Sequence, residues 1–446
     1  MYEYLIYNQL KNNVRANKSF HMPGHKGRGE FKRMFPVAEI DVTELSYSDN
    51  LACPDGVIAD AQRDIAQILG AERSYILTGG SSLGVFAMVY CASRRGSKII
   101  VPRNCHQSVW NACRVLGLEP VIVQGRTENG VMLPPEPQTI ARLIVNDITI
   151  AGLIVTSPDY YGNIAPLKEY SEILKGNNRL LMVDGAHGAH LAFEPKKRGY
   201  AGVYADIWVD GAHKTLATLT QGAILNIKNT ELISDAEEGL SIFRTTSPSY
   251  PIMASVEYGV KLLANNPAIY AGAKRAAEGL RRINKKIKIY PSADWTKFAV
   301  DCEPRRISAD LAAELLENRN IYCEFSDGRY ILFYLSPSVT AWDITCLKNS
   351  LKTVLSNKKL EGTYSPRGAI APTDRTYSFQ YALKQRHEWV ELDEAIGRMC
   401  AQNAGLTPPC TPVCVTGEII SEEAVRTLKS GKTYGLYDGK IKVVKK

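Results

Sequence analysis

A lysine and an aspartate each follow an apolar stretch of the chain. Asp184 ends the apolar stretch 180–183, and Lys214 comes shortly after the apolar stretch 205–209. A lysine amine can hold an aldehyde as a Schiff base, and a carboxylate can keep a pyridine nitrogen protonated so that the ring accepts electrons. This pair is what an enzyme with pyridoxal 5'-phosphate (PLP) requires, although both residue types are common after strands.

A glycine- and serine-rich turn at 78–84 follows another short apolar stretch and opens an apolar helical segment. Gly80, Ser81 and Ser82 leave room for backbone amides and hydroxyl groups to close on a phosphate at a helix N-terminus. The turn predicts a phosphate site, but such turns also occur for structural reasons alone.

Histidines gather in the first half of the chain, close to strand ends or glycine-rich turns. His106 begins a helix directly after an apolar stretch, where its ring could stack on a planar cofactor. The spacing of Asp184, His187 and His190 also fits a metal-binding trio. Because a lysine nearby suits a Schiff base better, we expect no metal here.

The elements that must position these residues alternate between residues 57 and 230. Helical periodicity or buried-helix composition predicts helices at 57–69, 81–94 and 106–116. Short apolar runs predict strands at 75–77, 98–101, 120–123, 152–155, 180–184, 205–209 and 222–226. This order predicts an α/β fold with a mostly parallel sheet and helices on both faces. Ligands of such sheets bind beyond the carboxyl ends of the strands, where Asp184 and Lys214 lie.

The remaining chain predicts two smaller domains. A helical stretch at 253–287 leads into a small α+β region at 288–355, and 356–373 has the composition of a linker. A helical start is expected at 389–400. We therefore predict an N-terminal segment with a PLP-binding large domain (1–255), a small domain (256–360) and a C-terminal domain (361–446).

Composition excludes several classes of protein. The chain has 446 residues, 45% hydrophobic and 22% charged, with a net charge of +8 spread along its length. Basic residues do not alternate with aromatic ones as in a nucleic-acid groove, and no apolar run reaches the ~20 residues that span a bilayer. The ten cysteines contain no CxxC pair. We expect a cytoplasmic protein with reduced thiols that binds neither nucleic acid nor membrane.

Several longer motifs stand in order along the chain. They are Ser19-Phe20-His21-Met22-Pro23-Gly24-His25-Lys26-Gly27, Pro54-Asp55-Gly56, Pro102-Arg103-Asn104-Cys105-His106, Thr156-Ser157-Pro158-Asp159-Tyr160-Tyr161-Gly162, Asp184-Gly185-Ala186-His187-Gly188-Ala189-His190, His213-Lys214-Thr215-Leu216, Thr245-Thr246-Ser247-Pro248, Pro408-Pro409 and Gly417-Glu418. Together these motifs resemble one family, the fold-type I PLP-dependent ornithine/lysine/arginine decarboxylases. Their order covers nearly the whole chain, so the fold of this family is expected.

The resemblance implies a role for each matching residue. Lys214 would bind the cofactor covalently, Asp184 would pair with the pyridine nitrogen, and His106 and Ala186 would cover the two faces of the ring. Ser81, Ser82 and His213 would hold the phosphate, and Gly80 and His187 complete the predicted site. Thr246 and Ser247 would reach the phosphate of the neighbouring subunit, which implies a homodimer with shared active sites. The chain starts near the first motif, so we expect the short form of the family, without an N-terminal wing domain.

The implied reaction is decarboxylation of a basic amino acid to an amine of the kind used in polyamine biosynthesis. The sequence does not choose among arginine, lysine and ornithine, and Glu418 is our candidate for contacting the distal cation. An aminotransferase of the same fold remains an alternative and would need a small-domain arginine, for which Arg305, Arg306 and Arg329 are available. A weakened paralogue with a binding role is the other alternative.

Some positions depart from the family pattern. Asp210 and Gly211 stand where relatives usually carry Gln-Ser, Gly185 where an acidic residue is frequent, and Val85 where an asparagine is common. Gly211 removes a hydroxyl donor, and Asp210 would bring a negative charge near the phosphate. We therefore expect an effect on cofactor affinity.

Overall fold

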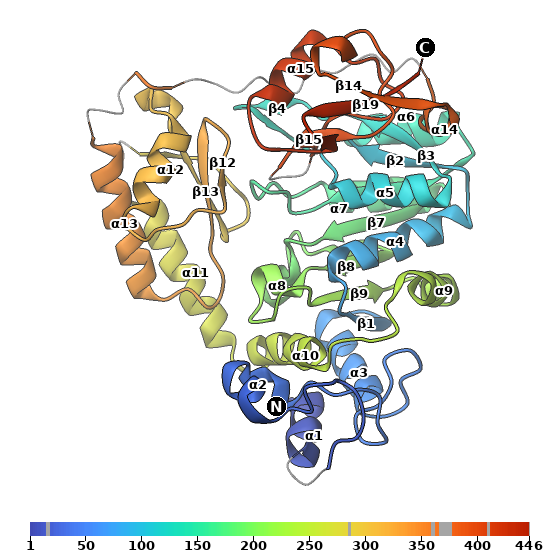
Figure 1. Cartoon of the computed structure of the whole chain (residues 1–446), viewed down its shortest axis with the longest axis vertical. Coiled ribbons are helices and arrows are strands. Elements are labelled where there is room, and N and C mark those ends of the chain that lie inside the picture. The colour runs from blue at the N-terminus through green and yellow to red at the C-terminus, as the bar shows by residue number, and fades with distance from the viewer. Residues whose placement is uncertain (15–17, 284–286, 358–361, 365–376, 408–410, 446) are drawn as a thin grey trace.

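The computed structural model describes residues 1–14, 18–283, 287–357, 362–364, 377–407 and 411–445. Its centre is a seven-stranded sheet in the order β1-β9-β8-β7-β6-β2-β3 (Figure 1). The strands are β1 (Arg73–Leu77), β9 (Ala223–Ile227), β8 (Ile207–Asp210), β7 (Leu180–Gly185), β6 (Ile150–Thr156), β2 (Lys98–Pro102) and β3 (Glu119–Val123). Only β9 runs antiparallel to its two neighbours. The predicted mostly parallel sheet is confirmed.

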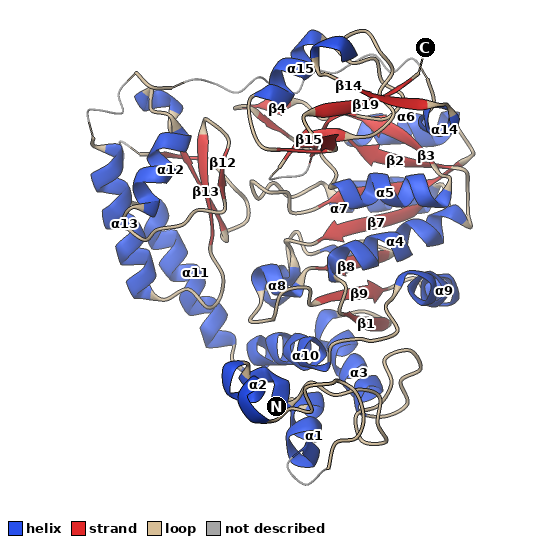
Figure 2. Cartoon of the chain, viewed as in Figure 1, coloured by secondary structure: helices blue, strands red, loops and turns tan. Residues whose placement is uncertain are grey.

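Helices cover both faces of this sheet, because its strands are apolar on both sides (Figure 2). Met182 of β7 packs with α4 (Gly80–Ser93), α5 (Gln107–Leu116) and α9 (Ile233–Phe243). The neighbouring Leu181 and Val183 pack on the opposite face. That face is covered by α3 (Val57–Leu69), α6 (Pro137–Asn146), α7 (Leu167–Gly176) and α10 (Tyr250–Asn265).

The helical stretch predicted at 253–287 is helical as far as Arg281 but is interrupted. It is two helices, α10 and α11 (Pro267–Arg281), separated at Asn266. Proline has no N–H for the helical ladder and disfavours helical geometry in the residue before it, and Asn266 accordingly has φ −132° and ψ 68°. The break lets the chain leave the large domain toward the small one.

The small domain lies beside the large domain in Figure 1 and contains a four-stranded antiparallel sheet, β10-β11-β13-β12. Its strands are β10 (Lys288–Ile289), β11 (Lys297–Asp301), β12 (Phe325–Ser326) and β13 (Tyr330–Tyr334). Helices α12 (Ala309–Glu317) and α13 (Ala341–Leu355) complete the domain. A tight turn at Asp327-Gly328 joins β12 to β13.

The C-terminal region is built from short strands, and the predicted helical start at 389–400 is wrong. Residues His387–Val390 form β14, which pairs with β19 (Lys440–Val444), and Asp393–Ala395 form a single 3-10 turn. Trp389 lies opposite Lys442, about fifty positions later, so a non-local pairing decides the structure. The remaining elements are α14 (Phe379–Lys384), β15 (Ala404–Leu406), β16 (Thr411–Cys414), α15 (Glu422–Lys429), β17 (Thr433–Tyr434) and β18 (Leu436–Tyr437).

The other elements are short. They are α1 (Leu5–Val14), α2 (Gly29–Met34), the ribbon of β4 (Thr127–Glu128) and β5 (Val131–Met132), and α8 (Ala212–Thr215). Most of the predicted linker 356–373 lies outside the described residues, and the domain boundaries stay predictions. Within the described ranges, no helix combines the length and the apolarity needed to cross a bilayer.

Candidate active site

A cavity of about 600 Å³ opens beyond the carboxyl ends of the parallel strands. The large domain, the small domain and the C-terminal region all contribute to its wall. Nine of the eleven predicted site residues line it, namely Gly80, Ser81, Ser82, His106, Asp184, Ala186, His187, His213 and Lys214. Thr246 and Ser247 are instead exposed, in the segment between α9 and α10.

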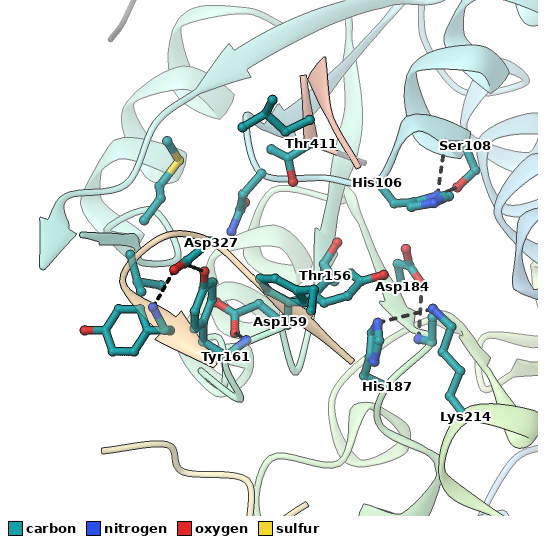
Figure 3. Close-up of a pocket in the computed structure, with 18 of the residues that line it drawn as sticks. His106, Ser108, Thr156, Asp159, Tyr161, Asp184, His187, Lys214, Asp327 and Thr411 are labelled. Atoms are coloured by element: carbon teal, nitrogen blue, oxygen red, sulfur yellow. Dashed lines mark hydrogen bonds between the residues drawn. The ribbon is translucent and has the colours of Figure 1, made fainter. Parts of the chain in front are cut away.

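Lys214 lies on α8, which follows β8 directly. Its Nζ is 3.2 Å from Nε2 of His187 and 5.8 Å from the centre of the Tyr160 ring. His187 is buried, and burial, reinforced by the charges of Lys214 and Lys297, holds its pKa well below the usual range. A neutral imidazole therefore faces the lysine amine (Figure 3).

Asp184 ends β7 and is also buried. Its Oδ1 accepts a hydrogen bond of 3.1 Å from the backbone N–H of Ala186, which fixes the carboxylate at the strand end. Figure 3 shows Asp184, His187 and Lys214 together on one side of the cavity. These three side chains meet because β7 and β8 are neighbouring parallel strands that end at the same edge.

His106 is the N-cap residue of α5. Its Nδ1 accepts from the backbone N–H of Ser108 at 3.2 Å and lies 2.9 Å from the Ser108 hydroxyl. Burial lowers the pKa of His106. The cap holds the His106 ring at the wall of the cavity.

The N-terminus of α4 forms the end of the cavity where a phosphate is predicted. The Ser81 hydroxyl oxygen is buried and has no hydrogen-bond partner in the structure. A Cβ on Gly211 would lie 2.3 Å from the carbonyl oxygen of Ala186 and 3.0 Å from Oγ of Ser81. No larger residue fits at 211 in this backbone, so a phosphate here would take its hydroxyl donors from other positions, among them Ser81 and Ser82. The donors and the buried carboxylate fit PLP.

Asp210 does not line the cavity, and the expectation of a charge beside the phosphate is wrong. Its Oδ2 accepts hydrogen bonds from Tyr200 (3.0 Å), Trp208 (2.9 Å) and Asn226 (3.0 Å). The carboxyl group is fully buried, and burial raises its pKa to about 7. Asp210 thus belongs to a polar network in the core behind the sheet edge.

The alternative of a metal trio does not match the geometry. Nε2 of His187 faces Lys214, whereas Nε2 of His190 lies 2.8 Å from Oδ1 of Asp294. Among the described residues, no group of three or more histidine, cysteine or acidic side chains is arranged to hold a metal ion.

The far end of the cavity carries acidic and aromatic side chains that sequence reasoning missed. Asp159, Glu303 and Asp327 line it, with Tyr161 and Tyr330 among the aromatic rings. Asp327 sits in the turn between β12 and β13, where Oδ1 accepts from the backbone of Tyr330 (2.6 Å) and Oδ2 accepts from the Tyr161 hydroxyl. Figure 3 shows Asp327, Tyr161 and Asp159 opposite Lys214. The Asp-Gly pair at 327–328 signals a turn, but nothing in the sequence places that turn at the cavity.

Arg329 also lines the far end, but its guanidinium group is occupied. Nε and Nη2 bind Asp301 at 3.1 and 2.9 Å, and Nη1 binds Glu303 at 2.7 Å. Arg305 and Arg306 are not among the described residues of the wall. The wall therefore offers no described arginine free of carboxylates for clamping a substrate carboxylate.

Glu418 lies outside the wall of the cavity. Its Oε2 is 2.9 Å from Nη2 of Arg103 and accepts from the backbone of Val415 at 2.8 Å, and both charged side chains are almost completely buried. This ion pair joins the C-terminal region to the loop after β2. Glu418 is a structural partner of Arg103 in this geometry.

The fold and the site define a class of protein, the fold-type I PLP-dependent enzymes. An aspartate at the end of β7 and a lysine on the short helix after the neighbouring β8 lie beside a helix N-terminus suited to phosphate. Within this class the chain belongs to the Orn/Lys/Arg decarboxylase family, because the model of the family's major domain matches residues 5–297. The family's cofactor is PLP, and its members are amino acid decarboxylases.

Relatives and solved structures agree with this assignment. The chain is 30% identical to the uncharacterised protein YaaO of Bacillus subtilis, over 98% of this chain and 96% of that protein. It is 29% identical to the arginine decarboxylase of the same organism, over 97% and 94% of the two chains. The crystal structure of the Francisella novicida lysine decarboxylase LdcF has the same fold, with a TM-score of 0.83 at 20% identity over 99% of this chain and 81% of that one.

Proposed function

We propose that this protein decarboxylates a basic amino acid, namely arginine, lysine or ornithine, to the corresponding amine and carbon dioxide. The observation that carries the proposal is the polarity of the cavity. One end holds Lys214 and Asp184, and the other holds carboxylates whose charge exceeds that of the single arginine among them. An amino acid with a cationic side chain matches both ends.

Each of these residues of the cavity has a separate role in the proposed reaction. PLP, when bound, supplies an electron sink for the bond between Cα and the carboxylate. Nζ of Lys214 would hold the cofactor aldehyde, and Asp184 would keep a proton at the pyridine nitrogen. The ring of His106 would stack on the cofactor, while Ser81, Ser82 and His213 would hold the phosphate. At the far end the cationic group of the substrate lies against Asp327 and the ring of Tyr161.

Decarboxylation is favoured over aminotransfer by the state of Arg329. An aminotransferase must bind the α-carboxylate through both half-reactions, and a guanidinium group is suited to that task. Here the guanidinium group of Arg329 is held by Asp301 and Glu303. The negatively charged surroundings suit a substrate cation instead.

The test is product formation by protein loaded with PLP. Arginine, lysine and ornithine are supplied in separate reactions, and agmatine, cadaverine and putrescine are measured by chromatography. The Lys214→Ala variant is the control for uncatalysed reaction. Amine in the wild type alone supports the proposal. Amino-group transfer to an added keto acid, without release of carbon dioxide, would contradict the proposal and show that the protein is an aminotransferase.

We further propose a homodimer in which Thr246 and Ser247 contact the phosphate site of the partner. Both side chains are exposed in the single chain, which leaves them accessible to a second copy. Sedimentation should give a dimer. Replacing Thr246 and Ser247 with alanine should weaken PLP affinity without dissociating the dimer, whereas a monomer that binds PLP normally would contradict this arrangement.

A further inference from the structure

A buried ionic cluster joins the large and small domains behind the cavity. It consists of His190, in the 3-10 turn Ala189–Phe193, and of Asp294 and Lys297 at the start of the small-domain sheet. All three side chains are completely buried. Oδ1 of Asp294 is 2.8 Å from Nε2 of His190, and Oδ2 is 3.3 Å from Nζ of Lys297.

The charges in this cluster stabilise one another. Removing an ammonium group from water costs several kcal/mol unless a partner compensates it. Burial alone raises the pKa of Asp294, but His190 and Lys297 outweigh burial and hold that pKa well below the usual range. Asp294 is therefore a carboxylate beside Lys297, whose Nζ also lies 2.9 Å from Oγ1 of Thr296.

A chain of contacts runs from Lys297 to the catalytic lysine. Nζ of Lys297 lies 4.4 Å from the centre of the Tyr334 ring. Tyr334 packs edge-on against His187, with ring centres 5.3 Å apart and an interplanar angle of 81°. His187 in turn places Nε2 3.2 Å from Nζ of Lys214. None of the three residues of the ionic cluster lines the cavity.

We propose that Lys297 is a positioning residue of the active site, which fixes Tyr334 against His187 and so holds Nε2 of His187 at Nζ of Lys214. A neutral imidazole exchanges a hydrogen bond with the lysine amine, whereas an imidazolium would repel a protonated one. A second positive charge at His187 is disfavoured because Lys297 is close and both groups are out of water. The proposal rests on the proposed role of Lys214 and is independent of which amino acid is the substrate.

The groups around His187 come from several elements. Those that carry or can acquire charge are Lys214, His106, Tyr160, Tyr334, Lys297 and Asp294. Of these, Lys214, Lys297 and His106 lower the pKa of His187, after the larger effect of burial, and Asp294 raises it. Removing the charge of Lys297 therefore leaves a raising influence from Asp294 and moves the pKa of His187 upward.

The test compares Lys297→Met with Lys297→Arg, which keeps the charge. The ring proton of His187 is followed by NMR in cofactor-free protein and is assigned by its loss in a His187→Gln variant. In Lys297→Met the titration should move upward by about one pH unit. The acidic limb of kcat/KM of the PLP-loaded enzyme should move in the same direction, and Lys297→Arg should change neither. A purely structural role would lower the melting temperature without moving either midpoint.

Two further measurements keep the proposal falsifiable if Lys297→Met does not fold. Lys297→Gln removes the charge but retains a hydrogen-bond donor for Asp294, and the same upward shift is expected. In the wild type, His187 should stay neutral throughout the pH range above 6. A wild-type titration at or above the ordinary value of about 6.5 would overturn the proposal. The result of these titrations does not affect the decarboxylase assay, so either proposal can be contradicted without the other.

Discussion

The two ends of the cavity are built from different parts of the molecule. At the near end, Asp184 and Lys214 follow neighbouring strands of one sheet, and His106 caps the helix after a third strand. At the far end, Tyr161 comes from the loop after β6 and Asp327 from a small-domain turn. The near end is thus built on one sheet, whereas the far end depends on how the large domain and the small domain meet.

The two ends also differ in how their charges are held. Near Lys214, burial holds the pKa values of His106 and His187 below the usual range. At the far end, carboxylates accumulate around a single arginine, and Asp327 is oriented by backbone N–H groups. Substitutions at the near end should therefore reduce the rate, and those at the far end should reduce affinity.

Replacing Lys214 with alanine should have the largest effect. Activity should fall by a factor on the order of 10⁴ or more, because the nucleophilic amine is lost. Covalent attachment of PLP should disappear, as measured by reduction with borohydride and mass spectrometry. A Lys228→Ala variant, which removes an exposed lysine bonded to the Gly202 and Val203 carbonyls, is the control. Covalent labelling that persists in Lys214→Ala would contradict the assignment.

Replacing Asp184 with asparagine should lower kcat by about 10²- to 10⁴-fold, the range of a lost proton-holding group. The cofactor should remain bound, since Lys214 and the phosphate site are intact. Stopped-flow kinetics and an absorbance spectrum of the bound cofactor measure the two effects. Asp210→Asn is the matched control, because Asp210 is equally buried but faces the core. An equal loss of kcat in the two variants would contradict a specific role for Asp184 in the reaction.

Replacing Arg103 with leucine should destabilise the protein by about 3–5 kcal/mol, because Glu418 is left as an unpaired buried charge. The free energy of unfolding is measured in urea. Arg33→Leu breaks the exposed pair with Glu30 and should cost less than ~1 kcal/mol. Similar losses in the two variants would mean that the Arg103–Glu418 pair does not join the C-terminal region to the large domain.

Replacing Asp327 with asparagine should raise KM for a basic amino acid about 10- to 100-fold, because hydrogen bonds to charged groups contribute ~1.5–3 kcal/mol. The kcat should change little, and PLP affinity should stay the same. Asp310→Asn, on the nearby helix α12 and outside the described wall, is the control. A loss of kcat with unchanged KM in Asp327→Asn would place Asp327 in the chemistry instead.

The smallest effect should come from the ionisation of Asp159. Burial raises the pKa of Asp159 to about 6, so its carboxylate is present above that pH and lost below it. KM for a cationic substrate should therefore rise about two- to fivefold between pH 7 and pH 5, a difference below ~1 kcal/mol. This rise in KM should be absent in the Asp159→Asn variant. A rise of the same size in that variant would mean that another group is being protonated.

The difference between the two ends also decides how much of the site could be predicted. Lys214, Asp184 and His106 follow strands that periodicity identifies, so their meeting at one sheet edge follows from the parallel order. Asp327 is a residue of an ordinary turn, and only the packing of the small domain brings it to Tyr161. Glu418 is the opposite case. It was a candidate for contacting the substrate because it lies in a family motif, but in the structure it forms a buried ion pair with Arg103 and does not line the cavity.

The same distinction applies to the fold. The strands of the central sheet were predictable because burial on both faces makes their residues almost continuously apolar. Trp389 and Val390 form a strand only because β19 lies beside them, and local sequence contains no sign of that partner. The residues around 253–287 are helical throughout by composition, yet Pro267 divides them.

The most direct test of the cavity's two ends is a comparison of basic amino acids with neutral analogues of the same length. Release of carbon dioxide by the PLP-loaded wild type is measured for lysine against norleucine, ornithine against norvaline and arginine against citrulline. We predict kcat/KM at least about tenfold higher for the cation in one or more pairs, with the preference reduced in Asp327→Asn. Equal turnover of cation and neutral analogue in all three pairs, or no carbon dioxide from any of them, would contradict the account.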